Sequence, residues 1–575
     1  MRKVLIANRG EIAVRVARAC AEYGVPSVAV YTEPDSDALH VRAAAEAYAV
    51  SDYLDVDALL TIASRAGADA VHPGYGFLAE NADAARRVEE AGLTWIGPTP
   101  ETIAVLGDKV RAREIARSVG APLAPGSDGP VSSAEEVVAF AREHGLPVMI
   151  KAAFGGGGRG LRVARSEEDV RDLYDSAVRE ARAAFGRGEC FVEKYLDRPR
   201  HVEVQVLGDG AGHVVVVGTR DCSVQRRGQK LVEEAPAPFL TAEQEVTIAA
   251  AARDICAAVD YRSAGTVELM LDRDGLISFL EVNTRLQVEH PVTEETTGVD
   301  LVRQQLLLAD GRPLEVTADP VPRGHAVELR VIAEDPGRGF LPGPGTVGRF
   351  DTPGGPGVRL DSGVVAGSAV AARYDSLLAK LVVHGPDRAA ALRRARAAVA
   401  AFAVDGVPTT LPFHARLLED PAFMADDGAL AVHTRWVEDE CGWLDELGEK
   451  RPEPPDEELV VRTWVEIDGR RAELGLPASL LGGPPAPGRG APGQADPAAP
   501  PTTQPDDGAV RAPLAGTLVS WSVEDGARVE EGQTVAVIEA MKMERPVTAP
   551  REGVLRHAVE SGAEVASGER LADVE

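Results

Sequence analysis

The chain has 575 residues, of which 45% are hydrophobic, so it is long enough for several domains that each bury a core. Its formal net charge of -29 argues against non-specific binding to nucleic acid or to anionic lipid, although local basic pockets for phosphate groups are compatible with it. Five scattered cysteines without a CxxC pair predict neither a disulfide framework nor a zinc site, which is typical of a cytoplasmic protein.

Neither end of the chain nor any segment between them predicts contact with a membrane. Residues 1–3 lead directly into a short apolar run that is too short for a signal-peptide core and is typical of a first strand. No apolar run approaches the length of a transmembrane helix. We therefore expect no membrane partner and no nucleic-acid partner.

Residues 1–110 alternate short β-rich runs with helical stretches, which predicts a parallel sheet covered by helices in a Rossmann-like domain. The β-rich runs are residues 4–7, 28–31, 70–71 and 95–96. The first strand-to-helix turn, residues 8–11, is not a GxGxxG motif, so binding of a dinucleotide is disfavoured. His72, in a His-Pro-Gly-Tyr-Gly stretch, is predicted to be a structural turn residue.

Residues 148–151 predict a strand that ends in Lys151, and a glycine-rich loop follows at residues 155–160. Consecutive glycines allow backbone N–H groups to converge on phosphate oxygens, and a lysine adds a positive charge to the same site. The segment predicts a nucleoside triphosphate as ligand. Its spacing is not the Walker pattern, and a flexible surface turn has the same composition, so the loop alone is weak support.

Residues 281–289 alternate polar and apolar side chains. If the chain stays extended throughout, five polar side chains share one face: Glu281, Asn283, Arg285, Gln287 and Glu289. Glu268 could lie on a neighbouring strand and point the same way. Two carboxylates and an amide oxygen suit Mg²⁺ bound to nucleotide phosphates. The alternative is an amphipathic strand with its polar face in water, but the mixture of amides and both charges, together with Lys151, favours a site.

Two segments separate this region from the C-terminal domain. Residues 446–480 contain a short β-like piece with an Asp468-Gly469 hairpin signal. Residues 481–508 are rich in proline, glycine and alanine and predict a linker. At ~3.1 Å per residue such an extended linker spans about 80 to 90 Å, enough to carry a domain between distant sites.

Residues 509–575 predict an all-β domain made of two similar halves. The first half contains Ala512, Pro513, Gly516, Gly526 and Gly532, and the second repeats them as Ala549, Pro550, Gly553, Gly562 and Gly568. Such a repeat suits a flattened barrel with Lys542 at the exposed join between the halves.

Lys542 lies between two methionines, and residues 539–544 resemble the attachment site in the biotinyl domain of biotin-dependent carboxylases. The flanking methionines distinguish the motif from related lipoyl domains. The resemblance implies covalent biotin on Lys542 and a biotin protein ligase as a partner. A lysine with a pKa near ~10.4 is mostly protonated, so its acylation needs an activated donor. The alternative is an ordinary surface lysine on a β domain.

The order of the upstream motifs resembles biotin carboxylase of the ATP-grasp class over about residues 1–445. The motifs are the lysine-ended strand, the glycine loop, residues 193–196, His201, residues 225–227, Lys230 and residues 281–289. Together with the biotinyl domain, and without a carboxyltransferase, the chain resembles the α subunit of an acyl-CoA carboxylase of the acetyl- or propionyl-CoA type.

The resemblance implies an α/β fold with six segments. They are a Rossmann-like domain at 1–110, an ATP-grasp domain at 111–315 with a mobile lid at about 130–204, a C-terminal α+β domain at 320–445, a β-like segment at 446–480 that could dock a subunit, a linker at 481–508 and an all-β biotinyl barrel at 509–575.

The resemblance also implies roles for single residues. ATP would be held by Lys109, Lys151, Gly157, Gly158, Glu193, Lys194, Leu196, His201 and Gln225. Mg²⁺ or Mn²⁺ would be held by Glu268, Glu281 and Asn283, and bicarbonate by Lys230, Arg285 and Gln287. Glu289 would remove the bicarbonate proton so that carboxyphosphate forms, and Arg330 would stabilise the biotin enolate. Gly228 stands where related enzymes often have histidine or a bulky residue, which puts one ATP contact in doubt.

Other functions remain open. The chain could be the biotin-bearing subunit of a two-subunit pyruvate carboxylase, whose partner would contain a TIM barrel. It could also be a carrier with a degenerate ATP-grasp scaffold, or a ligase that joins a carboxylate to an amine. The intact 281–289 segment argues against the second and the dedicated linker against the third. The expected partner is a carboxyltransferase β subunit in an oligomer of α and β subunits, and that partner would select the acyl group.

Overall fold

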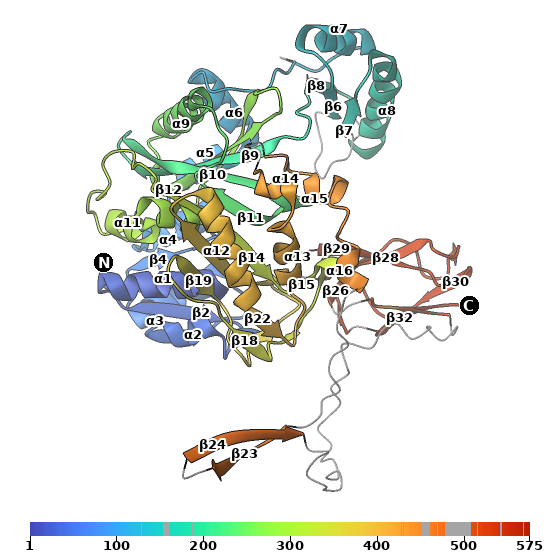
Figure 1. Cartoon of the computed structure of the whole chain (residues 1–575). Coiled ribbons are helices and arrows are strands. Elements are labelled where there is room, and N and C mark those ends of the chain that lie inside the picture. The colour runs from blue at the N-terminus through green and yellow to red at the C-terminus, as the bar shows by residue number, and fades with distance from the viewer. Residues whose placement is uncertain are drawn as a thin grey trace. The chain divides into compact units, whose positions relative to one another are not determined.

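The computed structural model describes the chain except for residues 128, 153–160, 186–187, 427, 429, 450–459, 468–469, 478–507, 514–515, 541–542 and 567. The chain divides into two compact units (Figure 1). The first comprises Met1–Glu334, Thr346–Ala371 and Ser376–Cys441. The second comprises Asp335–Gly345, Ala372–Asp375 and Gly442–Glu575.

The N-terminal part of the first unit is a parallel five-stranded sheet in the order β3-β2-β1-β4-β5. Its strands are β1 (Val4–Ile6), β2 (Ser27–Tyr31), β3 (Glu46–Ala49), β4 (Ala70–His72) and β5 (Thr94–Trp95). Its helices are α1 (Gly10–Tyr23), α2 (Leu39–Ala43), α3 (Val56–Ala66), α4 (Ala82–Glu90) and α5 (Pro100–Gly107). The predicted parallel sheet is confirmed. The edge strand β3 was not predicted, because it is half-buried and has no long apolar run.

His72 has the structural role predicted for it. It is fully buried at the end of β4, and its Nδ1 accepts a hydrogen bond from the Gly74 N–H at 3.0 Å. Burial lowers the His72 pKa to about 4, so the ring is neutral near pH 7.

The main body of the first unit is an antiparallel eight-stranded sheet in the order β13-β12-β9-β10-β11-β14-β21-β19. Its strands are β9 (Arg200–Asp209), β10 (Val214–Arg226), β11 (Gln229–Ala235), β12 (Arg262–Leu271), β13 (Ile277–Asn283), β14 (His325–Ile332), β19 (Val358–Ser362) and β21 (Leu377–Gly385). The pairing of β11 with β14 joins the segment predicted as ATP-grasp to the segment predicted as the C-terminal domain in one sheet.

The two faces of this sheet differ in chemistry. On β9, Val202, Val204 and Val206 belong to an apolar core that also contains residues of α9 (Ala242–Ala257). Alternating with them, His201, Glu203 and Gln205 are polar and nonetheless buried. Helix α10 (His290–Thr297) packs against β10, β11, β14 and β21. Helices α11 (Leu301–Ala309) and α12 (Arg388–Ala401) complete the cover, with α11 against β12 and α12 against β14 and β21.

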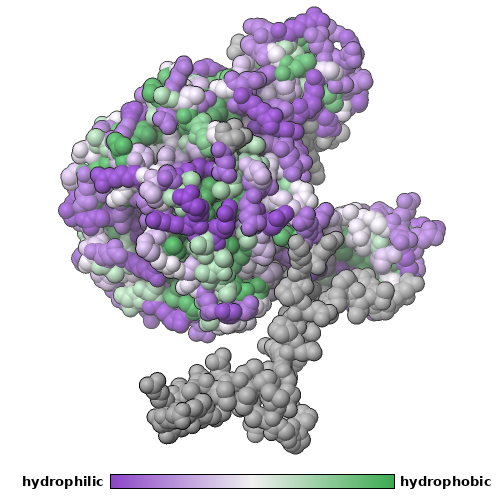
Figure 2. All heavy atoms as spheres, viewed as in Figure 1, coloured by the Kyte–Doolittle hydropathy of each residue, from purple (hydrophilic) through white to green (hydrophobic). Residues whose placement is uncertain are grey.

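The segment predicted as a lid has a small sheet and a core of its own within the first unit. It has a three-stranded antiparallel sheet of β6 (Val148–Ala152), β7 (Leu161–Ala164) and β8 (Cys190–Lys194), with helices α7 (Ala134–His144) and α8 (Glu167–Phe185) (Figure 1). Its core is separate from the others and includes Val137, Ile150 and Val192. On the face shown in Figure 2, the surface around α7 is mainly hydrophilic.

The remaining elements of this part of the chain are short. They are η1 (Glu33–Asp35), α6 (Lys109–Ser118), β15 (Glu334–Asp335), η2 (Pro336–Arg338), β16 (Leu341–Pro342), β17 (Gly345–Thr346), β18 (Arg349–Asp351), β20 (Ala369–Val370), β22 (Ala403–Asp405), α13 (Leu411–Leu417), α14 (Pro421–Met424), α15 (Trp436–Asp439) and α16 (Glu446–Glu449). No helix in the described part of the chain has the length and apolar character needed to cross a membrane.

The C-terminal domain consists of two four-stranded sheets, β25-β32-β30-β27 and β29-β28-β26-β31. The strands are β25 (Ala509–Arg511), β26 (Gly516–Trp521), β27 (Arg528–Val529), β28 (Thr534–Ala540), β29 (Met543–Thr548), β30 (Gly553–His557), β31 (Glu564–Val565) and β32 (Arg570–Val574). The predicted repeat is confirmed by its hydrogen bonds: the Gly532 N–H donates to Ala549 O at 2.9 Å, and the Gly568 N–H donates to Ala512 O at 2.8 Å.

Lys542 lies outside the described residues. The strands on either side of it, β28 and β29, are antiparallel neighbours whose register ends with Ala540 opposite Met543. Between residues 446 and 480, β23 (Val460–Ile467) and β24 (Arg470–Pro477) are antiparallel neighbours. The predicted turn at Asp468-Gly469 and residues 481–507 of the predicted linker, 481–508, lie outside the described residues.

Candidate active site

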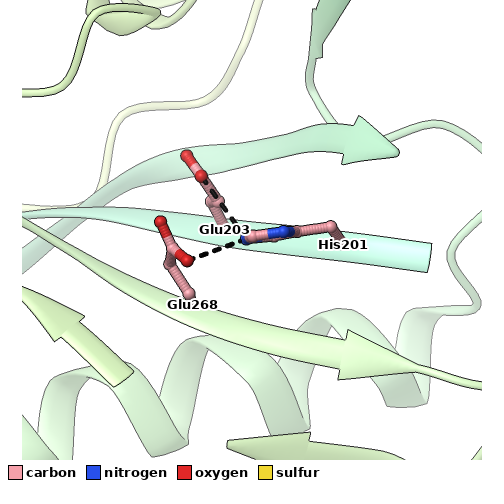
Figure 3. Close-up of side chains that lie close together, drawn as sticks. All are labelled: His201, Glu203 and Glu268. Atoms are coloured by element: carbon pink, nitrogen blue, oxygen red, sulfur yellow. Dashed lines mark ion pairs between the residues drawn. The ribbon is translucent and has the colours of Figure 1, made fainter. Parts of the chain in front are cut away.

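The polar face of β9 is the centre of a buried site. His201, Glu203 and Gln205 alternate with valines, so all three point away from the apolar core. Figure 3 shows His201 and Glu203 beside Glu268 of β12, with the His201 Nε2 3.0 Å from Glu268 Oε2 and 3.6 Å from Glu203 Oε1. Gln225 Nε2 donates to His201 Nδ1 at 3.0 Å, which leaves the Nε2–H to face the carboxylates.

Lys230, at the start of β11, joins three carboxylates. Its Nζ donates to Glu203, to Glu268 Oε1 at 3.2 Å and to Glu289 Oε1 at 2.8 Å. Burial alone would lower the Lys230 pKa, but the charges of Glu203 and Glu289 raise it well above its usual value. Lys230 is therefore a fixed cation that is suited to holding an anion.

Glu289 is fully buried between two cations. Its Oε1 accepts from Lys230, and its Oε2 accepts from Arg330 Nη2 at 2.9 Å. Burial would raise the Glu289 pKa, but Lys230 and then Arg330 outweigh burial and lower it. The carboxylate is therefore ionised near neutral pH and available as a proton acceptor.

The prediction that residues 281–289 form one extended strand is wrong. Strand β13 ends at Asn283, and the chain then turns so that Glu289 stands at the N-terminus of α10. Pro291 lies in the first turn of α10, a position that proline favours because its missing N–H has no helical partner there. Gln287 and Glu289 still reach the predicted site, but through a turn and a helix start.

Arg285 is held at the edge of the site by three side-chain acceptors and by the Leu286 carbonyl. Its Nη1 donates to Gln287 Oε1 at 2.6 Å, and its Nη2 donates to Asn283 Oδ1 at 3.0 Å. Its Nε donates to Glu80 Oε2 at 2.9 Å. Glu80 follows β4 of the N-terminal sheet and was not predicted as part of the site. This arrangement fixes the plane of the guanidinium group.

The predicted metal ligands lie together only in part. Glu268 and Glu281 are directly opposite each other on β12 and β13, so their side chains share one face and offer oxygen ligands that suit Mg²⁺ or Mn²⁺. Glu281 Oε2 lies 3.0 Å from Lys109 Nζ. The Asn283 amide donates to Glu268 Oε1 at 2.7 Å and accepts from Arg285. Its oxygen would reach a metal beside Glu268 only if the amide turned over.

A second buried lysine supports the turn that carries Glu289. Lys380 on β21 donates from Nζ to the Val288 carbonyl at 2.8 Å and lies 3.1 Å from Glu11 Oε1. Lys380 and Glu11 are both buried, and burial raises the Glu11 pKa although Lys380 opposes this. Because Val288 precedes Glu289, Lys380 fixes the backbone of the proton acceptor.

Lys380→Met should destabilise the first unit by about 3–5 kcal/mol, because it leaves the buried Glu11 carboxyl group and the Val288 carbonyl without their shared donor. Chemical denaturation followed by circular dichroism measures this change. The matched control is Arg435→Met, which breaks an exposed pair with Asp439 and should change stability by less than ~1 kcal/mol. If the two substitutions lowered the free energy of unfolding equally, the buried contacts of Lys380 would contribute no more to stability than an exposed ion pair.

Four family models match the chain. They are described as "Biotin carboxylase, N-terminal domain" over residues 1–103, "Carbamoyl-phosphate synthase L chain, ATP binding domain" over 108–317, "Biotin carboxylase C-terminal domain" over 328–439 and "Biotin-requiring enzyme" over 508–574. The alpha3 subunit of a biotin-dependent acyl-coenzyme A carboxylase from Mycobacterium leprae is 54% identical over 100% of this chain and 98% of its own length. The chain belongs to this family of acyl-CoA carboxylase α subunits.

Shorter relatives match the carboxylase part of this α subunit. A biotin carboxylase from Nostoc is 47% identical over 73% of this chain and 96% of its own. The biotin carboxylase domain of a thermophilic 2-oxoglutarate carboxylase bound to ADP is a similar solved structure, with a TM-score of 0.73 and 45% identity over 77% of this chain and 99% of that one. The biotin carboxylase subunit of a pyruvate carboxylase is also similar, with a TM-score of 0.72 and 44% identity over 78% of this chain and 100% of that one. The carboxylase part is thus shared by enzymes named for different acceptors.

As an acyl-CoA carboxylase α subunit, the protein uses ATP and Mg²⁺ or Mn²⁺ and carries covalent biotin. Among the predicted ATP residues in the lid, Lys151 of β6 donates to Glu193 of β8, and Lys194 donates to the Leu146 carbonyl at 2.9 Å. Leu196 is half-buried just after β8. The predicted contacts of Gly157 and Gly158 lie outside the described residues. The lid thus places one lysine and one carboxylate of the predicted set side by side.

Gly228, where the sequence put one ATP contact in doubt, has a conformational reason to be glycine. Arg226 pairs with Gln229, so Arg227 and Gly228 form a two-residue turn between β10 and β11. Both have positive φ, 50° and 79°, as in the hairpin turns that favour glycine. No heavy atom lies within 4 Å of the position of an added Cβ. Another side chain would fit in space, at the expense of backbone strain.

Four buried residues of this site were missed from the sequence: Glu203, Gln205, Arg220 and Glu233. Arg220 donates to Glu203 Oε2 at 2.8 and 3.0 Å and to Gln205 Oε1 at 2.7 Å, and it is fully buried. Glu233 accepts from Arg330 Nε at 2.6 Å. The alternation of His201, Glu203 and Gln205 with valine was a local signal of a polar strand face. Arg220 and Glu233 had no such signal, because their partners lie on other strands.

Proposed function

We propose that this chain carboxylates biotin attached to Lys542, with ATP and bicarbonate as substrates and carboxyphosphate as intermediate. We also propose that a separate carboxyltransferase β subunit passes the carboxyl group to an acyl-CoA of the acetyl or propionyl type. The observation that carries the proposal is the buried contact of Glu289 with both Lys230 and Arg330. A proton acceptor between two fixed cations is what the activation and use of bicarbonate require.

Lys230, Arg285 and Gln287 would hold bicarbonate, and Glu289 would accept its proton. The bicarbonate oxygen then forms a bond to the γ-phosphorus of ATP while the bond to ADP breaks. Bound bicarbonate would compete for the donors of Lys230 that now contact Glu289. Glu289 would thereby lose part of the charge that lowers its pKa and become a stronger base.

Glu268 and Glu281 would hold the metal ion, which supplies positive charge to the phosphate oxygens when it is bound. Lys109 would then be free to contact the nucleotide, because its present contact with Glu281 would be replaced. Lys151 in the lid adds a second cation. Exclusion of water by the lid would protect carboxyphosphate from hydrolysis.

Arg330 would act in the second half of the reaction. Carboxyphosphate releases CO₂ and phosphate, and that phosphate can take the proton from the ureido nitrogen of biotin. Arg330 Nη2, which now contacts Glu289, would donate to the ureido oxygen as negative charge develops there. In this proposal the Arg330 guanidinium group donates first to Glu289 and later to the ureido oxygen of biotin.

The identity of the final acceptor is proposed from the full-length relative, because the carboxylase part alone is also similar to that of a pyruvate carboxylase. The second candidate is therefore the biotin-bearing subunit of a two-subunit pyruvate carboxylase. A biotin protein ligase, an oligomer of α and β subunits, docking through residues 446–480 and a cytoplasmic location belong to the same proposal, as do the domain boundaries predicted from the sequence.

The purified, biotin-modified chain should hydrolyse ATP faster when bicarbonate is present. Mass spectrometry should then find a labile carboxyl group on the peptide that contains Lys542. Addition of the copurifying β subunit with labelled bicarbonate should move label into acetyl-CoA or propionyl-CoA and not into pyruvate. Biotin on Lys542 without bicarbonate-dependent hydrolysis would instead indicate a carrier with an inactive ATP site.

A further inference from the structure

Two buried carboxyl groups lie side by side behind Arg330. Glu233 of β11 and Glu328 of β14 are directly opposite each other in the antiparallel pair, and both are fully buried. Opposite side chains on one face of such a pair have Cβ atoms about 4.5–5.5 Å apart. Arg330 is two residues from Glu328 on β14 and therefore lies on the same face of that strand.

The hydrogen bonds of this pair are incomplete. Glu233 Oε1 accepts from Arg330 Nε at 2.6 Å, but Glu233 Oε2 and both Glu328 oxygens have no donor among the residues that the structure describes. An ionised carboxylate buried without donors is very unfavourable, whereas a protonated carboxyl group supplies a donor itself. Two adjacent buried carboxyl groups relieve this problem by keeping one proton between them.

The surrounding charges do not remove the need for that proton. The cations near Glu328 are Lys380 and Arg330, and Lys230 also acts on Glu233. Lys380 already donates to Val288 and contacts Glu11, and Lys230 serves three other carboxylates. Glu289 adds a further negative charge to both members of the pair.

We propose that Glu233 and Glu328 share one retained proton and that this pair is a positioning device for Arg330. The inference rests on the proposed function, because it concerns how Arg330 meets biotin. Glu233 Oε1 contacts both Nε and Nη2 of Arg330, at 2.6 and 2.5 Å, and Nη2 also donates to Glu289 Oε2 at 2.9 Å, so Glu233 fixes the edge of the guanidinium group that faces Glu289. If Glu328 were also ionised, a third carboxylate would weaken the field of Arg330 at the ureido oxygen.

The pKa directions agree with this geometry. Burial raises the Glu233 pKa to about 7 even though Arg330 opposes it, and burial raises the Glu328 pKa well above its usual value even though Lys380 opposes it. The Glu289 pKa is lowered instead. The proton therefore belongs to the pair and is lost as the pH rises.

The first test is the pH profile for carboxylation of added free biotin. The wild-type rate should fall by up to about tenfold per pH unit once the pair ionises, because the working form is the protonated one. Glu328→Gln keeps a neutral donor at every pH, so its profile should lack this alkaline fall. Glu328→Leu has no donor and should be slower than Glu328→Gln throughout. An identical alkaline fall in wild type and Glu328→Gln would overturn the proposal.

The second test detects the proton directly and does not depend on activity. Infrared difference spectra at neutral pH should show that Glu328→Gln and Glu233→Gln each remove the carbonyl band of a protonated carboxyl group. The matched control is Glu234→Gln, because Glu234 adjoins Glu233 but is paired with Arg388 and His325, and its pKa is lowered to about 2. That variant should remove only a carboxylate band.

The outcomes separate the two proposals. A lost carboxyl band in a protein that shows no bicarbonate-dependent ATP hydrolysis would support the shared proton and contradict the proposed function. Wild-type ATP hydrolysis in a protein whose spectrum loses no carboxyl band in either variant would support the proposed function and contradict the shared proton. If one of the two pair variants fails to fold, as judged by circular dichroism, the other still decides whether the band is present.

Discussion

Glu289→Gln should reduce bicarbonate-dependent ATP hydrolysis by about 10²–10⁴-fold, the usual contribution of a general base, while ATP binding stays nearly intact. The amide cannot take the bicarbonate proton. It also cannot accept hydrogen bonds from both Lys230 and Arg330 as the carboxylate does, because one of its two polar atoms is a donor. Steady-state hydrolysis with and without bicarbonate measures the first effect, and titration of an ATP analogue measures the second.

The matched control is Glu295→Gln. Glu295 is on the same helix, α10, but is partly exposed and contacts Arg359 at 3.3 Å, away from Lys230. This control should retain hydrolysis close to wild type. Wild-type turnover in Glu289→Gln would exclude Glu289 as the base. Loss of ATP binding in the same variant would show that Glu289 mainly maintains the charge balance around Lys230.

Much of the fold was predictable because its signals are local. Alternating β-rich and helical stretches predicted the parallel sheet of residues 1–110, and the glycine repeat predicted the two-sheet barrel. The joining of β11 to β14 was not predictable in this way, because pairing between strands about a hundred residues apart leaves no period in either strand. That pairing places Arg330 beside Glu233 and Glu289.

In the candidate site, too, the residues with a local sequence signal were predictable and the others were not. Period-two alternation correctly indicated a shared polar face for Glu268 and Glu281, since the two residues lie directly opposite each other on paired strands. It failed beyond Asn283, where the chain turns into α10, although Pro291 was a local signal of a helix start. Glu80 reaches Arg285 from a distant part of the chain, and no local pattern connects the two.

Because the barrel has a core of its own, a substitution in the barrel should affect biotin attachment without affecting the carboxylation of free biotin. The described residues that surround Lys230, Glu289 and Arg330 all belong to the first compact unit. The barrel has its own core, which includes Leu518, Ile538 and Leu571. A substitution in the barrel should therefore leave the ATP site folded.

Lys542→Arg should abolish biotin labelling of the chain and leave carboxylation of added free biotin detectable. Arginine keeps the positive charge and similar length but does not form the amide bond to biotin. Lys542 is the only lysine in residues 509–575, so no neighbour in the barrel can replace it. Avidin blotting measures labelling, and fixation of labelled bicarbonate measures the free-biotin reaction. Lys450→Arg, outside the barrel, is the control and should label normally. Persistent labelling of Lys542→Arg would move the attachment site to another lysine, whereas loss of the free-biotin reaction as well would show that the carrier contributes to the ATP site itself.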